Sequence, residues 1–215
     1  MITKFSYWLA RRLAEKAERD DEDYIRYGIE VVLSTLSKIT IFLIISLVFN
    51  VFLEMFSIIL SFVALRVITG GVHMSTYSRC LTTSLLMFVL PTFLFRQIAV
   101  DHSSIYFTSV VFLLAVIFVF IYVPVSAANR PIPQEKYQFF KWTSLIFLIS
   151  WFVLMTSLFY YSFPRYGYIA FYSTVGILLQ TFTLTPFGYA LLENIDRYLS
   201  KKERQLGGVK NEKGI

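Results

Sequence analysis

Cysteine and histidine are both scarce: the 215 residues include one cysteine, Cys80, and two histidines. A single cysteine excludes an intrachain disulfide, so cysteine usage does not indicate a redox compartment. Because the histidines and the scattered acidic residues provide no closely spaced set of ligands, a structural zinc site is not expected. We predict no metal ion and no other cofactor.

Charged residues make up only 16% of the chain, whereas 56% of the residues are hydrophobic and the mean hydropathy is +0.62. The mean hydropathy is far above that of a soluble domain and indicates an integral membrane protein in contact with lipid. The formal net charge of +6 could suggest nucleic acid. The basic residues, however, lie at the ends of apolar runs, as on the cytoplasmic face of a membrane protein, so no nucleic-acid partner is expected.

The amino-terminal residues predict an interfacial helix. Within residues 3–19, apolar side chains from Phe5 to Ala17 recur on one side and charged side chains cover the other. This pattern is typical of an amphipathic helix on the membrane surface, and a packed helix of a soluble cap would show it too. We assign residues 1–30 to this segment. No cleavable signal peptide is expected, because polar and amphipathic residues precede the first apolar run.

Long apolar runs predict an all-α polytopic membrane protein with about six transmembrane helices. Residues 31–69 are long enough for two spans joined by a turn near Asn50. The later spans are expected at residues 81–100, 104–125, 143–161 and 167–192. The membrane domain then covers residues 31–192, and residues 193–215 form a charged cytoplasmic tail.

Lys38 lies inside the first predicted span if that span begins near Val31. An unpaired ammonium there costs several kcal/mol, so Lys38 would reach to the interface, face a partner or contact substrate. If the span instead begins at Ile39 and is short, Lys38 lies at the interface. The sequence leaves both registers open, and a polar residue in this place is compatible with a homodimer.

Lysine and arginine are distributed asymmetrically around the predicted spans. The amino-terminal segment, the polar break at residues 66–80, the proline-containing loop at residues 127–142 and the tail all carry them, whereas the other side keeps only Arg96 and Arg165. Because lysine and arginine accumulate in cytoplasmic loops, both termini, the polar break and the proline-containing loop are expected in the cytoplasm.

The polar break at residues 66–80 is the candidate functional site. An imidazole beside a thiol is the pair needed for thiolate attack on a carbonyl, and the break contains His73 and Cys80. On an unbroken helix these two residues would lie about 10.5 Å apart along the axis, so the chain must turn to bring them together. Gly70 and Gly71 can adopt positive φ and permit that turn.

The residues after the turn predict the start of a helix. Ser75, Thr76 and Ser78 are candidate N-caps, which would place Cys80 in the first turn, where the helix dipole favours a thiolate. Backbone N–H groups there are candidate oxyanion donors. His102 lies in a short connection between spans, and we interpret it as a surface residue rather than a second catalytic imidazole.

The pattern Arg66-x3-Gly70-Gly71-x-His73-x6-Cys80 between apolar spans resembles the signature of the accessory gene regulator B family of bacterial membrane cysteine endopeptidases. The resemblance implies an enzyme of the bacterial cell membrane that removes the carboxyl-terminal part of a short precursor peptide. The remainder is cyclised to a thiolactone or lactone autoinducing peptide for quorum sensing. By the same resemblance, His73 is the general base and Cys80 the nucleophile of a dyad, and Arg66, Gly70 and Gly71 shape the site.

Basic residues are candidates for binding the precursor, in particular an acidic carboxyl-terminal segment. The alternative for each is an anchor at the cytoplasmic interface, and for Arg66 both roles stay open. Besides Arg66, the candidates are Lys38, Arg79, Lys136 and Lys141. The competing function is a non-enzymatic small membrane transporter or partner subunit, in which the polar break is only a re-entrant loop.

Overall fold

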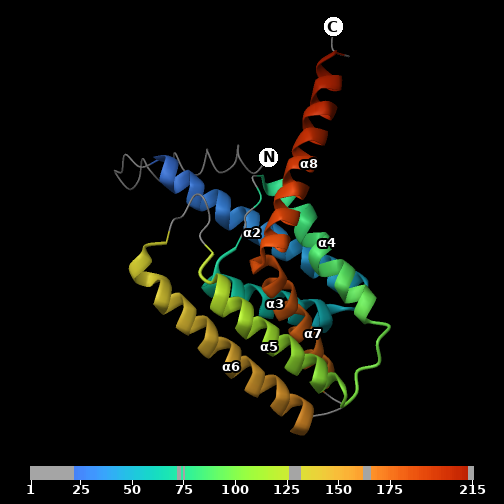
Figure 1. Ribbon diagram of the computed structural model, residues 1–215. Helices are drawn as coiled ribbons and strands as arrows, with labels where there is room; N and C mark the ends of the chain where they lie inside the picture. The colour runs from blue at the N-terminus through green and yellow to red at the C-terminus, as the bar shows by residue number, and fades with distance from the viewer. Residues whose placement is uncertain (1–21, 72–73, 75, 126–131, 162–165, 213–215) are drawn as a thin grey trace. The chain divides into compact units, whose positions relative to one another are not determined.

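The computed structural model describes residues 22–71, 74, 76–125, 132–161 and 166–212, with side chains described in these ranges except at 22–24, 26–27 and 202–212. The regular elements in these ranges are helices (Figure 1), which confirms the all-α class. They are α2 (Glu22–Val48), α3 (Phe52–Thr69), α4 (Tyr77–Phe95), α5 (Ser104–Tyr122), the 3-10 helix η1 (Gln134–Lys136), α6 (Tyr137–Tyr161), α7 (Gly167–Leu184) and α8 (Pro186–Glu212). Six helical stretches, in α2 to α7, are long and apolar enough to cross a membrane, as predicted. The amphipathic helix predicted at residues 3–19 lies outside the described residues.

The chain forms two compact units, residues 1–52 and 53–215, and each is described by itself. The first unit contains α2, whose apolar stretch Gly28–Val48 is continuous through Lys38. After α2 the chain turns at Asn50, which has a φ of 51°. An asparagine tolerates this left-handed conformation better than most residues, and the turn lies where the sequence predicts it.

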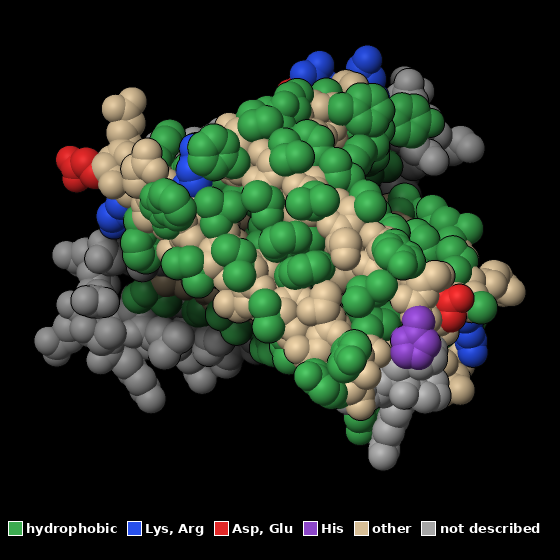
Figure 2. Space-filling view, turned by 60° about the horizontal axis from the view of Figure 1, so that its bottom comes forward, with side chains coloured by type: hydrophobic (Ala, Val, Ile, Leu, Met, Phe, Trp, Pro, Cys, Tyr) green, Lys and Arg blue, Asp and Glu red, His purple; other side chains and the backbone are tan. Residues whose placement is uncertain are grey.

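Helix α7 is the central helix of the second unit. It contacts α4, α5, α6 and α8, and Figure 1 shows α5 lying between α6 and α7. Side chains along most of α7 are buried, among them Phe171, Ile177 and Gln180. The apolar side chains that remain exposed lie on helices such as α5 and α6, and Figure 2 shows one face covered mainly by hydrophobic side chains with charged ones near its edges. Such a face is suited to contact with lipid tails.

Helices α3 and α7 run parallel and approach each other closely. A Cβ atom on Gly176 would lie 2.1 Å from Ser61 Oγ and 2.3 Å from the Ile58 carbonyl oxygen. Ser61 Oγ also donates a hydrogen bond to the Ser173 carbonyl oxygen at 2.9 Å. Small residues permit this approach between helices in a membrane, where packing and interhelical hydrogen bonds hold helices together. The resulting register brings the carboxyl ends of α3 and α7 side by side.

The sixth span ends at Leu184 and not, as predicted, at Leu192. Thr185 has an extended backbone, and a residue that precedes proline is disfavoured in the helical region. The Gly188 N–H donates to Thr185 Oγ1 at 3.0 Å, so Thr185 caps a new helix with Pro186 at its first position. The predicted charged tail is therefore helical as far as Glu212.

Candidate functional site

The double-glycine turn ends α3 in the conformation that the sequence predicts. Gly70 has a φ of 78° and Gly71 a φ of 149°. The Gly70 N–H donates to the Arg66 carbonyl oxygen at 2.9 Å, which closes the helix with a left-handed cap. A Cβ on Gly70 would lie 2.3 Å from the Val125 carbonyl oxygen, and one on Gly71 would lie 2.6 Å from Arg66 Nη1. Close approach to a backbone atom is therefore a second reason for glycine at position 70, whereas the end of the Arg66 side chain near Gly71 could move.

This turn is bonded to the chain that follows α5. The Val125 N–H donates to the Thr69 carbonyl oxygen at 3.0 Å, and Gly70 and Val125 form an isolated parallel bridge. Val125 lies just before the proline-containing loop at residues 127–142. The end of α3 and the end of α5 thus meet at the same end of the second unit.

A buried glutamine of α7 holds the turn from the other side. The Gln180 side chain is fully buried, and its Nε2 donates to Thr69 Oγ1 at 2.9 Å and to the Gly70 carbonyl oxygen at 3.0 Å. Its Oε1 accepts from Thr183 Oγ1 at 3.1 Å and from Arg66 Nη1 at 3.4 Å. Both ends of the amide are therefore used. Sequence reasoning missed Gln180, although a strongly polar amide inside an apolar span is a signal that could have found it.

Arg66, in the last turn of α3, contacts both Gln180 and Phe62. Its guanidinium carbon is 5.6 Å from the centroid of the Phe62 ring, and its Nη1 contacts Gln180. The charge of Arg66 also interacts electrostatically with Cys80. Arg66 is therefore bonded to the residue that holds the turn, and its roles in shaping the site and in contacting substrate stay predictions.

Cys80 lies in the first turn of α4, as predicted. Its N–H donates to the Thr76 carbonyl oxygen at 3.0 Å, and its side chain is half-buried. Thr76 occupies the N-cap position with an extended backbone, but its hydroxyl makes no capping bond and lies 3.3 Å from Ser78 Oγ. Cys80 is thus close to the positive end of the helix dipole. His73 lies outside the described residues, so its pairing with Cys80 stays a prediction.

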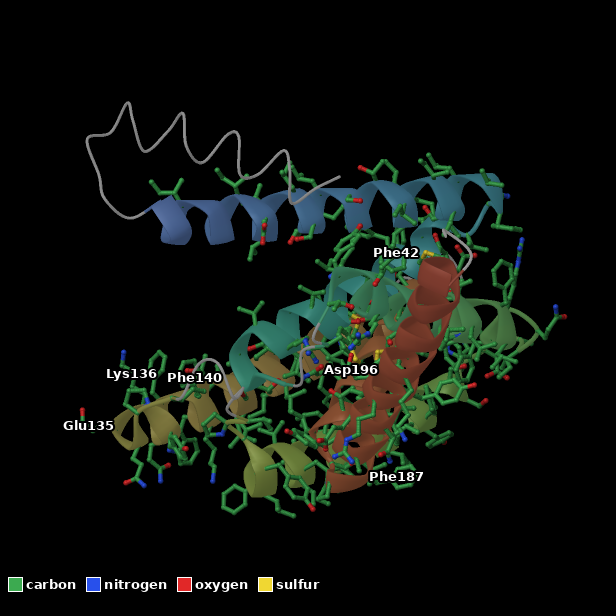
Figure 3. All side chains as sticks on the ribbon, turned by 90° about the horizontal axis from the view of Figure 1, so that it is seen from above. Phe42, Glu135, Lys136, Phe140, Phe187 and Asp196 are labelled. Atoms are coloured by element: carbon green, nitrogen blue, oxygen red, sulfur yellow. The ribbon has the colours of Figure 1, made fainter. Side chains whose placement is uncertain are left out.

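Arg79, the residue before Cys80, forms an ion pair with α8. Its Nη1 lies 3.4 Å from Asp196 Oδ1, and the two side chains are 12% and 23% exposed. In Figure 3, Asp196 lies among the side chains between α8 and the neighbouring helices of the unit. An acidic segment of a precursor would have to compete with Asp196 for Arg79.

The lysines predicted to bind substrate are not gathered beside Arg79. Lys136 is exposed in η1, and Figure 3 shows it far from Asp196, the partner of Arg79. The prediction that Lys141 lies in a loop was wrong. Lys141 lies in α6, and its ammonium is 5.0 Å from the centroid of the Phe120 ring. The prolines upstream do not prevent helix from Tyr137 onward. Lys38 belongs to the first unit, so its relation to the site stays a prediction.

His102 is exposed in the connection between α4 and α5. Cys80 lies at the beginning of α4, so the whole length of that helix separates the two residues. The neighbouring Asp101 accepts hydrogen bonds from the Ser103 hydroxyl at 2.5 Å and from the Ser103 N–H at 2.9 Å. The bond from the Ser103 hydroxyl lowers the pKa of Asp101. The location confirms His102 as a surface residue away from Cys80.

Comparison with known proteins identifies the family. The sequence profile of accessory gene regulator B (AgrB) matches residues 2–184. The chain belongs to the AgrB family. Among similar proteins, AgrB-like protein 2 of Clostridium perfringens is 29% identical over 214 residues, which cover 94% of this chain and 99% of that protein. Accessory gene regulator protein B of Staphylococcus intermedius is 30% identical over 162 residues, which cover 75% of this chain and 81% of that protein. No solved structure matches the chain.

The AgrB match ends at the same residue as helix α7. It covers α2 to α7 and ends at residue 184, where α7 ends, so α8 lies beyond it. Arg66, Gly70, Gly71 and Cys80 all fall inside the AgrB match, as does Gln180. The ion pair between Arg79 and Asp196 joins the matched part to the helix that lies beyond it.

Proposed function

We propose that this AgrB-family chain is a membrane cysteine endopeptidase that cleaves a short precursor peptide and cyclises the amino-terminal product. The product is a thiolactone or lactone autoinducing peptide for quorum sensing. The observation that carries the proposal is the position of Cys80, the chain's only cysteine, which is half-buried in the first turn of α4 and follows the double-glycine turn that Gln180 holds. The amino-terminal end of a helix is a common place for a nucleophilic cysteine.

The reaction proceeds through an acyl-enzyme. His73 takes the proton of the Cys80 thiol, the sulfur bonds to the scissile carbonyl carbon, the carbon–nitrogen bond breaks, and His73 returns the proton to the leaving amine. A cysteine thiol or serine hydroxyl of the bound peptide then attacks the thioester, closes the ring and releases Cys80. General acid and base assistance of this kind contributes about two to four orders of magnitude in rate.

The first step is thermodynamically unfavourable, so another process has to drive it. Conversion of an amide to a thioester is uphill, whereas exchange of the thioester for a second thioester is close to neutral. Removal of the carboxyl-terminal fragment drives the first step by mass action. Water competes with the ring-closing nucleophile, and a site at the mouth of apolar helices limits the access of water.

The precursor reaches the site along the membrane surface. We place both termini and residues 66–80 in the cytoplasm, on the basis of lysine and arginine distribution. An amphipathic segment of the precursor would lie in the interface beside residues 3–19. In this arrangement, the scissile carbonyl approaches Cys80 from the cytoplasmic side.

Intact mass spectrometry of the detergent-purified protein tests the proposal. The protein is incubated with a synthetic candidate precursor that has an amphipathic start, a central cysteine or serine and an acidic carboxyl-terminal end, and wild type is compared with Cys80→Ala and His73→Ala. The expected result is an adduct equal in mass to the trimmed peptide, labile to hydroxylamine and absent in Cys80→Ala. Binding of the peptide without cleavage or adduct in wild type would overturn the proposal and favour a transport or partner role.

A further inference from the structure

Helix α4 contains a buried hydroxyl group that has no partner among the described residues. Thr83 is 8% exposed, and its Oγ1 is buried without a hydrogen bond in the part of the chain that the structure describes. Other threonines of α4 donate to the carbonyl oxygen four residues earlier: Thr82 to Ser78 at 3.0 Å and Thr92 to Phe88 at 2.7 Å. A buried hydroxyl left unpaired is unfavourable, because it has lost its bonds to water without replacement. Thr83 therefore calls for an explanation that Thr82 and Thr92 do not need.

The unpaired hydroxyl lies next to the cysteine on the helix surface. Cys80 and Thr83 are three residues apart in α4, a spacing at which Cβ atoms are about 5–6 Å apart. Side chains on a helix point back toward its amino terminus, so Thr83 extends toward the turn that contains Cys80. Arg79 lies four residues before Thr83, and its side chain, which pairs with Asp196 of α8, is 12% exposed. Thr83 is thus a sheltered donor about one helical turn from the half-buried thiol, on the same side of α4.

We propose that the Thr83 hydroxyl is an oxyanion donor, and therefore a catalytic residue, for acyl transfer at Cys80. It donates a hydrogen bond to the oxygen of the scissile carbonyl group while the carbon of that group bonds to the cysteine sulfur. The proposal rests on the proposed function and adds a residue to it. A donor that is already buried and unpaired in the free protein loses no other bond when the oxyanion forms.

The Cys80 sulfur forms a bond to the carbonyl carbon, and the π electron pair of the carbonyl group moves to its oxygen. Thr83 hydrogen-bonds this oxygen and keeps its own proton. The electron pair then returns, the carbon–nitrogen bond breaks, and the amine nitrogen takes the proton that His73 received from the thiol. Thr83 donates a hydrogen bond to the same oxygen again when the peptide's thiol or hydroxyl attacks the thioester.

Two rates measured on the same purified variants test this role. One is acylation of Cys80 by the same synthetic candidate precursor, followed by intact mass. The other is alkylation of Cys80 by iodoacetamide, a reaction at a saturated carbon that forms no oxyanion. Since Cys80 is the chain's only cysteine, both rates report on one residue.

Thr83→Val keeps the shape of the side chain and removes the hydroxyl. It is expected to lower the acylation rate about 100-fold, as for loss of one oxyanion donor, and to leave the alkylation rate unchanged. Thr83→Ser keeps the hydroxyl and is expected to retain most of the acylation rate, and Thr83→Ala provides a second hydroxyl-free variant. Thr92→Val is the matched control, because Thr92 is a buried threonine of the same helix with a satisfied hydroxyl. It is expected to acylate at the wild-type rate.

The outcomes separate this role from the proposed function. If wild type forms the Cys80 adduct and both Thr83→Val and Thr83→Ala acylate as fast as wild type, the role of Thr83 is overturned and the proposed function stands. Parallel losses of acylation and alkylation would also overturn it, because Thr83 would then support the fold or the thiol. If wild type forms no adduct, the proposed function is overturned, and the role of Thr83 with it.

Discussion

Asp196 Oδ1 lies 3.4 Å from Arg79 Nη1, so α8 is bonded to the residue that immediately precedes Cys80. The turn before Cys80 is held by Gln180, which lies in α7. Helices α7 and α8 follow each other directly in the chain, separated by Thr185 alone. The carboxyl-terminal third of the protein therefore fixes residues 66–80 at both ends.

Breaking the pair between Arg79 and Asp196 is expected to reduce cleavage moderately. The ion pair is partly exposed, and such a pair contributes about 0.2–1 kcal/mol, so Asp196→Asn should lower the cleavage rate only severalfold. The measurement is the rate of precursor cleavage in wild type, Asp196→Asn and the charge swap Arg79→Asp with Asp196→Arg. The swap should recover part of the loss. Glu193→Gln is the control, since it removes only the exposed bond between Glu193 and Arg197 at 2.6 Å. Equal effects of Asp196→Asn and Glu193→Gln would contradict a specific role for the pair.

Gln180→Leu is expected to lower both stability and cleavage. It leaves the Gly70 carbonyl oxygen and the Arg66 guanidinium without the amide that now bonds them, and a buried polar group without a partner costs about 1–3 kcal/mol. If the turn shifts by about 1 Å, cleavage should fall about 100-fold. Gln180→Glu keeps an acceptor for Arg66 but loses the donor to Gly70, so it should recover little. Thermal unfolding and cleavage rates are measured together.

The matched control for Gln180 is Thr174→Val. Thr174 is a fully buried polar residue of α7 whose Oγ1 lies 3.0 Å from Thr108 Oγ1 in α5. Its substitution should reduce the thermal stability slightly and leave the cleavage rate per folded molecule unchanged. A similar loss of cleavage in Thr174→Val and Gln180→Leu would show that Gln180 acts only through general stability.

Gly70→Ala is expected to abolish measurable cleavage. The added Cβ would lie 2.3 Å from a backbone oxygen of Val125, and the left-handed backbone costs a non-glycine residue about 1–2 kcal/mol in addition. Gly28→Ala is the control, because a Cβ on Gly28 meets no atom within 4 Å. That variant should be neutral or slightly more stable, since alanine favours a helix by about 0.5–1 kcal/mol over glycine. Wild-type cleavage by Gly70→Ala would contradict the described turn.

Gly176→Ala is expected to separate α3 from α7 and to lower the stability of the folded protein. The new methyl group would overlap the Ile58 carbonyl oxygen, a backbone atom that cannot rotate away. Overpacking of this kind costs about 1–3 kcal/mol. Thermal unfolding in detergent measures the effect, and an unchanged midpoint would show that the two helices do not pack as closely as described.

Local patterns in the sequence predict the spans and the shape of the motif. A membrane-spanning helix needs a continuous apolar run, so hydropathy alone located the helical spans. The positive φ of Gly70 and the placement of Cys80 in a first helical turn follow from the conformational limits of the residues concerned. Local rules failed at the end of α7, because the leucines after Pro186 continue the apolar run beyond the point where the backbone breaks. Local rules also failed at Lys141. The prolines that suggested a loop lie before Tyr137, where α6 begins, so they do not interrupt the helix that contains Lys141.

By itself the sequence determined the lengths of the apolar runs, the turn at the double glycine and the candidate nucleophile Cys80. Only the tertiary structure brought Gln180 to Gly70 and Asp196 to Arg79, and only it buried the Thr83 hydroxyl with no partner in the part of the chain that the structure describes. The bonded residues are 110 and 117 positions apart, so no local pattern links them. Their meeting depends on the register between helices, which close packing at small residues such as Gly176 sets.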